Sequence, residues 1–337
     1  MQILSNISLA DHSTMRLGGT AHFLVEVHTK DELVQAIEWA THRRVPILCI
    51  GDGSNIIFQD GYDGLVVINH ITGREVVQED AHSSTLVIGA GEPWDAVVQW
   101  SVELNLSGIE KLSLIPGTAG ATPVQNVGAY GAEIADTFVE LEAYDLQANR
   151  FVTISRDECH FGYRTSIFKS LTDRRYIITS MTLKLSKQPP QPPFYETLSR
   201  YLDEHHITTY TPQTIRDAVI AIRRSKLPDP AAIANTGSFF KNPLVSQEVL
   251  ESLQQRFDQV PHWPAGSRVK LSAGWLISQA GLKDYAAHGM KLYEHNALVF
   301  VNDHAKSYAD LVAFKQEVID RVEKALGITL EQEPELV

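Results

Sequence analysis

Apolar positions in the first seventy residues recur with the two periods that distinguish strands from helices. Three short segments are apolar at every second position or more, and the segment between the first two has apolar residues three and four positions apart. These patterns predict strands at 21–27, 45–51 and 64–70 and a helix at 29–44. Strand, helix and strand in succession indicate a parallel βαβ unit, whose ligands tend to bind where the strands end. The loop 51–55, with the sequence GDGSN, follows one of these ends.

The same two periods continue through the rest of the chain. They predict further strands at 84–91, 138–145, 150–155, 176–186, 297–302 and 327–337, and further helices at 93–106, 211–226, 246–257, 272–280 and 307–327. The last helix has the clearest ends, because Ser307 and Asp310 form a capping-box pattern and Gly327 provides a stop. This mixture of strands and helices predicts an α+β protein.

A chain of 337 residues is too long for one ordinary hydrophobic core, so two or three domains are expected. The clearest linker is 187–193, KQPPQPP, because four prolines in seven residues exclude a helix or a central strand. The predicted division is 1–70, then 71–210 including the linker and the loop after it, then 211–330, with a last strand at 331–337.

Composition and charge exclude several classes of protein. Hydrophobic residues make up 44% and charged residues 21%, which is typical of a globular protein. The net charge of −12 argues against nucleic acid as a partner, because phosphate backbones need a basic surface. No apolar run reaches the roughly 20 residues of a membrane span, and polar residues come too early for a signal peptide. Cys49 and Cys159 form no CxxC pair, so no metal site is expected. We therefore expect a cytoplasmic protein that binds neither nucleic acid nor membrane.

Two glycine-rich loops are candidates for ligand binding. In GDGSN, small residues would let backbone N–H groups approach a diphosphate, although ordinary turns use the same residues. Ile56 takes the third glycine position of a dinucleotide fingerprint, which disfavours a Rossmann fold. The segment 114–131, LIPGTAGATPVQNVGAYG, has four glycines and two prolines, and structured loops of this length are usually functional. A compact surface loop held by its own side chains is the alternative.

Two segments supply cations in this acidic chain. In FGYRTSIFK, residues 161–169, the aromatic neighbours of Arg164 predict a partly buried arginine that pairs with a carboxylate of the protein or of a substrate. In RRSKLPDP, residues 223–230, three cations precede a break in the pattern. They indicate local anion binding, the C-terminal end of a helix, or both.

The segment NTGSFFKNP, residues 235–243, raises the question of what Ser238 does. A nucleophilic serine needs a histidine base and an orienting carboxylate, and the GxSxG elbow is absent because Phe240 takes its last position. A hydrolase is therefore unsupported. A polarised hydroxyl can instead deliver a proton, which needs no triad. A turn residue above an aromatic core is the other interpretation.

Taken together, these segments resemble one known family, the UDP-N-acetylenolpyruvoylglucosamine reductases, flavoenzymes of peptidoglycan precursor synthesis. The resemblance covers nearly the whole chain. Its motifs follow the family order: IGDGSNIIF, LIPGTAGATPVQNVGAYG, FGYRTSIFK, KLPDP, GSFFKNP, SAGWLISQAGLK, NALVFVN and LEQEPELV. It implies a two-lobed FAD-binding module of the vanillyl-alcohol-oxidase type at 1–70 and 71–210, and a separate α+β substrate-binding domain at 211–330. It also implies FAD and NADPH as cofactors, a UDP-sugar substrate and a cytoplasmic monomer.

The implied reaction reduces UDP-N-acetylglucosamine enolpyruvate to UDP-N-acetylmuramate. NADPH reduces FAD, and hydride then reaches the terminal CH₂ carbon of the enolpyruvyl group. Negative charge develops on the adjacent carbon and its carboxylate, where a cation and an acid are stabilising. That carbon must finally receive a proton. By motif match, Ser238 is the proton donor, and Arg164 and Glu333 stabilise the intermediate.

The resemblance also implies binding residues. The cofactor-binding positions would be Gly51, Gly53, Ser54, Asn55, Pro116, Gly117, Thr118, Gly120, Gly128 and Tyr130. The substrate-binding positions would be Tyr163, Tyr195, Lys226, Asn242 and Asn296. Tyr195 follows the proline-rich linker, where the longer subclass of the family carries a tyrosine on a mobile loop.

Some positions need a choice or depart from the family pattern. Glu333 is chosen over Glu331 and Glu335 because the register of the family's Leu-x-x-Glu motif falls on it. Without the resemblance, all three would be taken as solvated charges. Asn296 stands where relatives often have glutamine. Asp52 replaces the usual middle glycine, and an acid beside a pyrophosphate is unfavourable unless it points away.

Three other functions are alternatives. A nucleotide-sugar binding protein without turnover would lack part of the set Arg164, Ser238 and Glu333, which is complete here. A serine hydrolase would need the missing elbow. A flavin oxidase that acts on an alcohol or hydroxy acid is the nearest rival, and the segments GSFFKNP and KLPDP favour the reductase.

Overall fold

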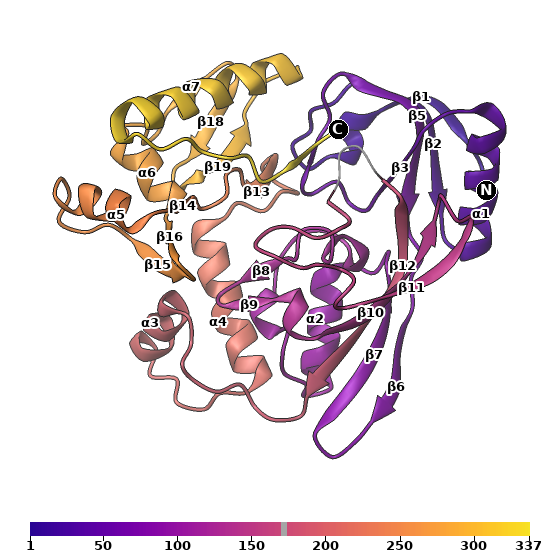
Figure 1. The fold of residues 1–337 in the computed structure, drawn as a ribbon, viewed down its shortest axis with the longest axis horizontal. Helices are drawn as coiled ribbons and strands as arrows, with labels where there is room; N and C mark the ends of the chain where they lie inside the picture. The colour runs from indigo at the N-terminus through magenta and orange to yellow at the C-terminus, as the bar shows by residue number, and fades with distance from the viewer. Residues whose placement is uncertain (170–173) are drawn as a thin grey trace. The chain divides into compact units, whose positions relative to one another are not determined.

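The computed structural model describes residues 1–169 and 174–337, which form two compact units (Figure 1). The first unit consists of residues 1–7, 20–53 and 62–225, and the second of residues 8–19, 54–61 and 226–337. Each unit therefore combines segments that lie far apart in the sequence.

A four-stranded sheet opens the first unit. Its strands are β1 (Leu4–Ser8), β2 (Thr20–Val27), β3 (Ile47–Ile50) and β5 (Gly61–Asn69), in the order β1-β2-β5-β3. Strands β3 and β5 are parallel, and helix α1 (Lys30–Arg43) connects β2 to β3 as predicted. The apolar stripe of this helix, Leu33, Ile37 and Ala40, is buried against apolar side chains of β2 and β5. The hydrophobic period thus predicted α1 and three of the four strands of this layer, and it missed β1, whose residues are mostly exposed.

A five-stranded antiparallel sheet forms the second layer of this unit. Its strands are β6 (Arg74–Glu79), β7 (Ser83–Gly89), β10 (Phe138–Asp145), β11 (Arg150–Ser155) and β12 (Tyr176–Ser186), in the order β11-β10-β12-β7-β6. Helix α2 (Trp94–Glu103) packs its buried face on this sheet, and Trp94 donates to the carbonyl of Leu112 at 3.0 Å. Strand β6 was not predicted, because all six of its residues are exposed and show no apolar period.

Helices α3 (Glu196–Glu204) and α4 (Pro212–Lys226) form a further core of the first unit. Helix α3 was not predicted. The sequence pattern places α4 at the start of the third segment, whereas α4 through Ser225 belongs to the first compact unit. The reason is its inner face, which packs on α3 and carries Arg216, whose guanidinium pairs with both carboxylate oxygens of Asp95 at 2.7 and 2.9 Å. The boundaries of the functional domains stay a prediction.

The second unit contains three small sheets and three helices. Its strands are β4 (Ile56–Ile57), β13 (Asn235–Ser238), β14 (Leu244–Val245), β15 (His262–Ala265), β16 (Arg268–Leu271), β17 (Ala286–Ala287), β18 (Met290–Tyr293), β19 (Asn296–Asn302) and β20 (Glu335–Leu336), and its helices are α5 (Gln247–Gln254), α6 (Ala273–Gln279) and α7 (Tyr308–Leu326). The sheet orders are β13-β19-β18-β17, β14-β16-β15 and β20-β4. Helices α6 and α7 cover the first of these sheets (Figure 1), and the ring of Phe300 stacks on Phe239 and meets Phe314 edge-on.

The two ends of α7 match the prediction, but the segment after it does not. Ser307 and Asp310 form the capping box, and Gly327 ends the helix with φ 70°. The predicted strand at 327–337 is wrong except for β20, which pairs in parallel with β4. Ile328 and Leu330 are buried as a strand pattern requires, but Pro334 has no N–H for a sheet ladder.

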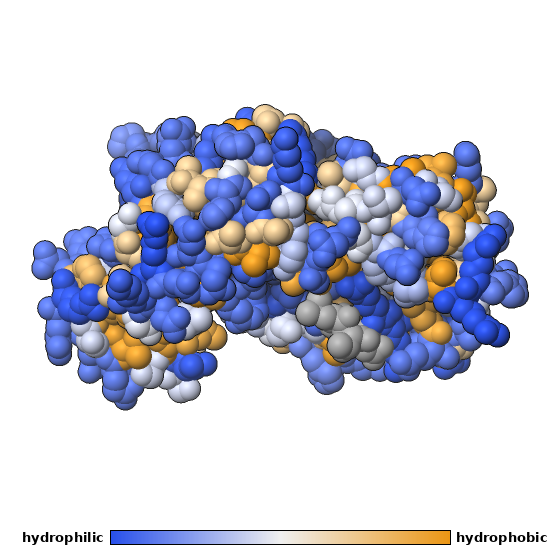
Figure 2. All heavy atoms as spheres, turned by 90° about the horizontal axis from the view of Figure 1, so that it is seen from above, coloured by the Kyte–Doolittle hydropathy of each residue, from blue (hydrophilic) through white to orange (hydrophobic). Residues whose placement is uncertain are grey.

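Hydrophilic side chains cover most of the face drawn in Figure 2, as expected for a net charge of −12. Of the helices that the structure describes, none combines the length and the apolar character of a membrane span.

Candidate functional site

The two glycine-rich loops predicted to bind the cofactor touch each other in the first unit. Loop 51–53 follows directly after β3. A Cβ atom at Gly51 would lie 2.2 Å from Oγ1 of Thr118, a residue of the loop 114–131, so no side chain fits there. These two segments are far apart in the sequence, and in the structure they form one surface.

Backbone N–H groups of these loops fit an anionic ligand. To the residues that the structure describes, the N–H groups of Asp52, Gly53, Gly117 and Thr118 donate no hydrogen bond. Gly53 and Thr118 are buried, and buried N–H groups rarely lack an acceptor. Gly53 has φ 62°, the left-handed conformation found in turns that gather N–H groups around anions. A diphosphate group has the chemistry that these donors need.

The loop 114–131 is held in place by neighbouring secondary structure. The carbonyl of Gly117 accepts the N–H of Trp94 at 2.9 Å, and the N–H of Gly120 donates to the carbonyl of Ala90 at 2.8 Å. A Cβ atom at Gly120 would lie 2.5 Å from that of Ala90, so this glycine permits a close approach to the sheet. The loop is therefore compact, as the alternative interpretation required, and still presents unsatisfied donors.

Arg223 of α4 joins the two ends of this loop, a role that was not predicted from the sequence. Its Nε donates to the carbonyl of Leu114 at 3.3 Å, and its guanidinium bonds the hydroxyl of Tyr130. Burial lowers the pKa of Arg223. The charges of Tyr130 and Asp95 and the hydrogen bond with Tyr130 act in the opposite direction. Arg224, by contrast, is exposed. The cations therefore do not act as one cluster. Arg216 and Arg223 are seven residues apart and therefore lie on one face of α4. This spacing could have indicated that Arg223 points inward as Arg216 does.

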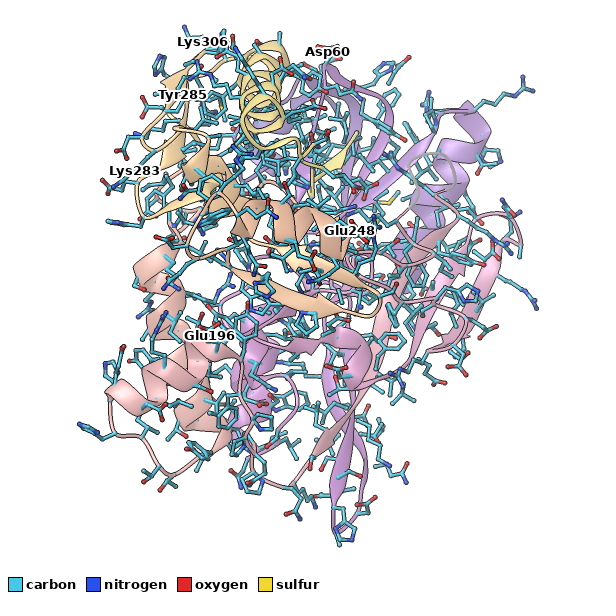
Figure 3. The ribbon with its side chains drawn as sticks, turned by 60° about the vertical axis from the view of Figure 1, so that its left-hand side comes forward. Asp60, Glu196, Glu248, Lys283, Tyr285 and Lys306 are labelled. Carbon is cyan, nitrogen blue, oxygen red and sulfur yellow. The ribbon has the colours of Figure 1, made fainter. Side chains whose placement is uncertain are left out.

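Three predicted tyrosines come together in the first unit. The ring of Tyr195, just before α3, meets that of Tyr130 edge-on with centroids 6.2 Å apart. Burial raises the pKa of Tyr195, and smaller contributions come from Glu196, Tyr130 and Tyr163. Glu196, the first residue of α3, is labelled in Figure 3. One predicted cofactor residue thus lies beside two predicted substrate residues.

Arg164 lies at the tip of a two-residue turn in an unusual backbone conformation. Gly162 and Thr165 exchange hydrogen bonds of 3.0 and 3.3 Å around Tyr163 and Arg164. Arg164 has φ 56°, which is rare for a long side chain. Its side chain is partly buried, as predicted, and Nη2 donates to the carbonyl of Gly128 at 2.9 Å. Such strain is typical of functional positions.

Ser238 ends strand β13 on the aromatic core of the second unit. It pairs in register with Val299 of β19, and the rings of Phe239 and Phe240 behind it are fully buried. Gly237 has φ 71°, and its N–H donates to Oδ1 of Asn235 at 2.8 Å. The backbone around Ser238 is therefore fixed from both sides, while Ser238 itself is only partly buried.

Glu333 lies on the segment beside Ser238. Its N–H donates to the carbonyl of Phe239 at 2.9 Å. Glu331 is exposed and pairs with Lys241, and Glu335 belongs to β20. Of the three terminal carboxylates, Glu333 is the one whose backbone bonds the residue next to Ser238.

Two predicted substrate residues gather near the start of α6. Oδ1 of Asn242 accepts the N–H of Ala273 at 2.9 Å, and Oδ1 of Asn296 accepts the N–H of Leu298 at 3.1 Å. The NH₂ groups of both amides donate no hydrogen bond to the described residues, which leaves two donors for a ligand. Lys226, the last residue of α4, is exposed.

The loop GDGSN continues from the first unit into the second at Ser54. The carbonyl of Ser54 accepts Oγ1 of Thr14 at 3.4 Å, and that of Asn55 accepts the N–H of Glu335 at 2.9 Å. The side chain of Asp52 is exposed. Partial desolvation raises the pKa of its carboxyl group, and the charge of His70 lowers it by a smaller amount. Pro116 is exposed beside Gly117.

Replacement of Gly51 by alanine should release the flavin. The new methyl group would collide with the side chain of Thr118, so one of the two loops must move. We expect the purified variant to retain less than about a tenth of the wild-type flavin, because overpacking of a close contact costs about 1–3 kcal/mol. The measurement is the ratio of flavin to protein absorbance.

The double variant Gly51→Ala, Thr118→Ala removes the colliding atoms and should regain part of the flavin. Thr118→Ala alone serves as the control, with flavin content close to wild type. Full flavin in Gly51→Ala would contradict the close approach of the two loops.

Two parts of the chain match models of known families. Residues 21–154 match the model of an FAD binding domain, and residues 229–337 match the C-terminal domain of UDP-N-acetylenolpyruvoylglucosamine reductase. The enzyme of that name from Ralstonia nicotianae is 40% identical over 98% of this chain and 97% of its own length. The one from Pseudomonas aeruginosa is 38% identical over 100% of this chain and 99% of its own length.

A solved structure has the same fold along the whole chain. It is a UDP-N-acetylenolpyruvylglucosamine reductase from Thermus caldophilus, with a TM-score of 0.70, 24% identity and coverage of 100% of this chain and 99% of that one. These matches confirm the predicted α+β architecture of an FAD-binding module with a separate C-terminal domain. The chain therefore belongs to the UDP-N-acetylenolpyruvoylglucosamine reductase family, FAD-dependent oxidoreductases that act on a UDP-sugar in peptidoglycan precursor synthesis.

Proposed function

We propose that the chain uses NADPH to reduce UDP-N-acetylglucosamine enolpyruvate to UDP-N-acetylmuramate, with Ser238 as the proton donor. The observation that carries this proposal is the hydrogen bond of 2.9 Å from the Glu333 N–H to the Phe239 carbonyl. It holds a carboxylate-bearing segment beside the serine, in a unit where the serine backbone is also fixed by β19. Family membership supplies the cofactor and the class of substrate.

FAD, when bound, supplies the hydride, received from NADPH, that reduces the enolpyruvyl double bond. The N–H groups of Asp52, Gly53, Gly117 and Thr118 would hold its diphosphate, since each lacks an acceptor among the described residues. Gly51 would keep the two loops close together, and Gly120 and Gly128 would let the loop 114–131 approach Ala90 and Glu133. The remaining cofactor contacts would come from Ser54, Asn55, Pro116 and Tyr130.

The chain's own residues then manage charge and a proton. Negative charge develops on the carbon next to the reduced CH₂ and on the neighbouring carboxylate. The guanidinium of Arg164 stabilises that charge, and its fixed turn means that little reorganisation is needed. The hydroxyl of Ser238 delivers its proton to the carbon, and Glu333 polarises the developing charge as the third member of the set.

The UDP portion would be bound by polar and aromatic side chains. Asn242 and Asn296 offer NH₂ donors near the start of α6. Lys226 is a flexible point charge suited to a diphosphate. Tyr163 and Tyr195, which lie with Tyr130 in the first unit, would close on the sugar nucleotide. We also propose a monomer in the cytoplasm, which gel filtration and cell fractionation test.

The visible spectrum of the purified protein tests the function. A bound flavin absorbs at roughly 450 nm, because the chemistry resides in the cofactor. NADPH should bleach this band, and colour should return only when the enolpyruvyl substrate is added. Recovery on addition of air or an alcohol oxidation product, without that substrate, would favour an oxidase. Absence of a flavin band would exclude the proposal.

Replacement of Ser238 by alanine should separate the two half-reactions. Bleaching by NADPH should keep its wild-type rate, because no proton from Ser238 is needed there. Reduction of the enolpyruvyl substrate should fall by about 10²- to 10⁴-fold, the usual contribution of a positioned acid. Stopped-flow absorbance measures both rates.

Ser278→Ala is the matched control, since the hydroxyl of this exposed serine of α6 donates to the carbonyl of Gly274 at 2.9 Å, within its own helix. Both of its rates should equal those of the wild type. Equal losses in the two half-reactions of Ser238→Ala would argue against a proton donor.

A further inference from the structure

Asn126, a residue of the loop 114–131 to which no role has been given so far, connects three segments through one side chain. It is only 1% exposed and has φ 47°, a conformation that asparagine tolerates. Its Nδ2 donates to Oε2 of Glu133 at 2.8 Å and to the carbonyl of Gly162 at 3.1 Å. Its Oδ1 accepts the N–H of Ala135 at 3.1 Å. Both N–H bonds of this amide and its carbonyl are thus engaged.

The bond to Gly162 reaches the turn that carries Arg164. Gly162 is one of the two residues whose mutual hydrogen bonds close that turn. At the other end of the same connection, Nη2 of Arg164 donates to the carbonyl of Gly128, two residues after Asn126. These contacts form one closed ring. It runs from the Asn126 amide to the turn at Gly162, through the guanidinium of Arg164 to Gly128, and back along the backbone to Asn126.

This ring explains how a strained arginine keeps its position. A residue with φ 56° and a long side chain tends to relax unless its surroundings hold the backbone. Glu133 anchors Asn126 in turn, because its carboxylate both accepts from Nδ2 and caps the short helix Ile134–Asp136. The short ribbon of β8 (Gly128–Ala129) and β9 (Ala132–Glu133), visible in Figure 1, keeps Gly128 and Glu133 in register.

We propose that Asn126 is a positioning residue for Arg164, and that it sets the rate of substrate reduction through the turn at Gly162. The inference rests on the proposed role of Arg164 in that reaction. It assigns to Asn126 no contact with the substrate. It predicts that loss of the amide donors affects the substrate half-reaction selectively.

The variant Asn126→Asp tests this, because it keeps the shape and removes both N–H donors. At pH 8, substrate reduction should fall by about 30-fold or more, as a misplacement of 1 Å can cost a hundredfold. Flavin content and bleaching by NADPH should stay within twofold of wild type. Equal loss in both half-reactions, or loss of flavin alone, would overturn the proposal in favour of a role in loop folding.

A pH profile gives a second readout that a merely structural role would not move. The new carboxylate would face Glu133 and the Gly162 carbonyl, so its pKa would be raised. Protonation restores one O–H donor, and the ratio of variant to wild-type substrate reduction should therefore rise severalfold between pH 8 and pH 5.5. A ratio independent of pH would contradict the proposal.

Coupling to Arg164 separates this inference from the proposed function. In an Arg164→Ala background, Asn126→Asp should have less than twofold further effect, because the residue it positions is gone. If Arg164→Ala alone retains wild-type activity, the proposed function fails. If Arg164→Ala lowers the rate of substrate reduction and Asn126→Asp lowers the remaining rate by its full factor, only the present inference fails.

Two further variants complete the design. Asn149→Asp is the control, an exposed asparagine with φ 49° in the turn between β10 and β11, and should match the wild type in every rate. If Asn126→Asp does not fold, Glu133→Ala tests the same junction by removing the carboxylate that accepts from Nδ2. A selective loss of several-fold in substrate reduction would support the proposal, and an unchanged rate would overturn it.

Discussion

Replacement of Arg164 by asparagine should remove catalysis without weakening the fold. We expect kcat for substrate reduction to fall by about 10²- to 10³-fold, as when one charge-stabilising donor is deleted. The left-handed φ of 56° costs an arginine about 1–3 kcal/mol and an asparagine less. The lost hydrogen bond to the Gly128 carbonyl is worth about 1 kcal/mol. The free energy of unfolding should thus stay within about 1 kcal/mol of wild type, as denaturant unfolding can measure.

Arg44 provides a matched control for this variant. It has φ 57° at the C-terminal end of α1 and is exposed. Arg44→Asn should stabilise the protein slightly, because asparagine suits a left-handed helix end, and should leave all rates unchanged. A large loss of stability in Arg164→Asn would show that the turn depends on the guanidinium. Wild-type turnover in Arg164→Asn would exclude the proposed role.

Replacement of Arg216 by methionine should have the largest effect on stability. The side chain of Arg216 is 5% exposed, and that of its partner Asp95 is 34% exposed. Removal of the guanidinium leaves the Asp95 carboxylate without its bidentate partner. Removal of one partner of a buried pair costs about 3–5 kcal/mol, and the partial exposure of Asp95 favours the lower end. Chemical denaturation at pH 7 should therefore show a free energy of unfolding lower by about 3 kcal/mol.

The effect should depend on pH with a defined sign. Burial would raise the pKa of Asp95, but the bonds from Arg216 and the Leu114 N–H lower it overall. A carboxyl whose pKa is lowered on folding stabilises the protein above its unfolded pKa and loses this contribution as the pH falls. The difference between wild type and Arg216→Met should therefore shrink below about pH 4.

The double variant Asp95→Asn, Arg216→Met provides the control. It removes the buried charge that the single variant leaves unpaired, so it should be more stable than Arg216→Met. Because Oδ1 of Asp95 also accepts the Leu114 N–H at 2.5 Å, and asparagine keeps an oxygen there, the start of the loop 114–131 should be preserved. A double variant no more stable than Arg216→Met would contradict this account.

Much of the fold could be predicted because local patterns and the final packing agree. Helix α1 has its apolar stripe where the period placed it, and α7 begins and ends at its predicted caps. Strand β6 was not predicted, because an exposed edge strand has no buried face and therefore no alternation of apolar and polar residues. The terminal strand was predicted too long, since burial of Ile328 and Leu330 looks the same whether or not the backbone has a sheet partner.

The sequence pattern proposes candidate site residues by their type, but it does not reveal their neighbours in space. Arg223 was grouped with Arg224 and Lys226 by sequence, yet it turns inward to bond Leu114 and Tyr130. No role was predicted for Asn126, because an asparagine among glycines is typical of an ordinary turn. Its importance comes from three partners that lie elsewhere in the sequence.

The sequence by itself determined the secondary structure of most elements, the division into more than one core and, through its ordered motifs, the family. Periodicity, caps and motifs are properties of neighbouring residues, so they can be read locally. Only the tertiary structure decided that Gly51 meets Thr118, that Asn126 holds the turn of Arg164 and that Glu333 lies beside Ser238. Such contacts join residues far apart in the chain, and they form only when burial of the shared cores outweighs the entropy of bringing those segments together.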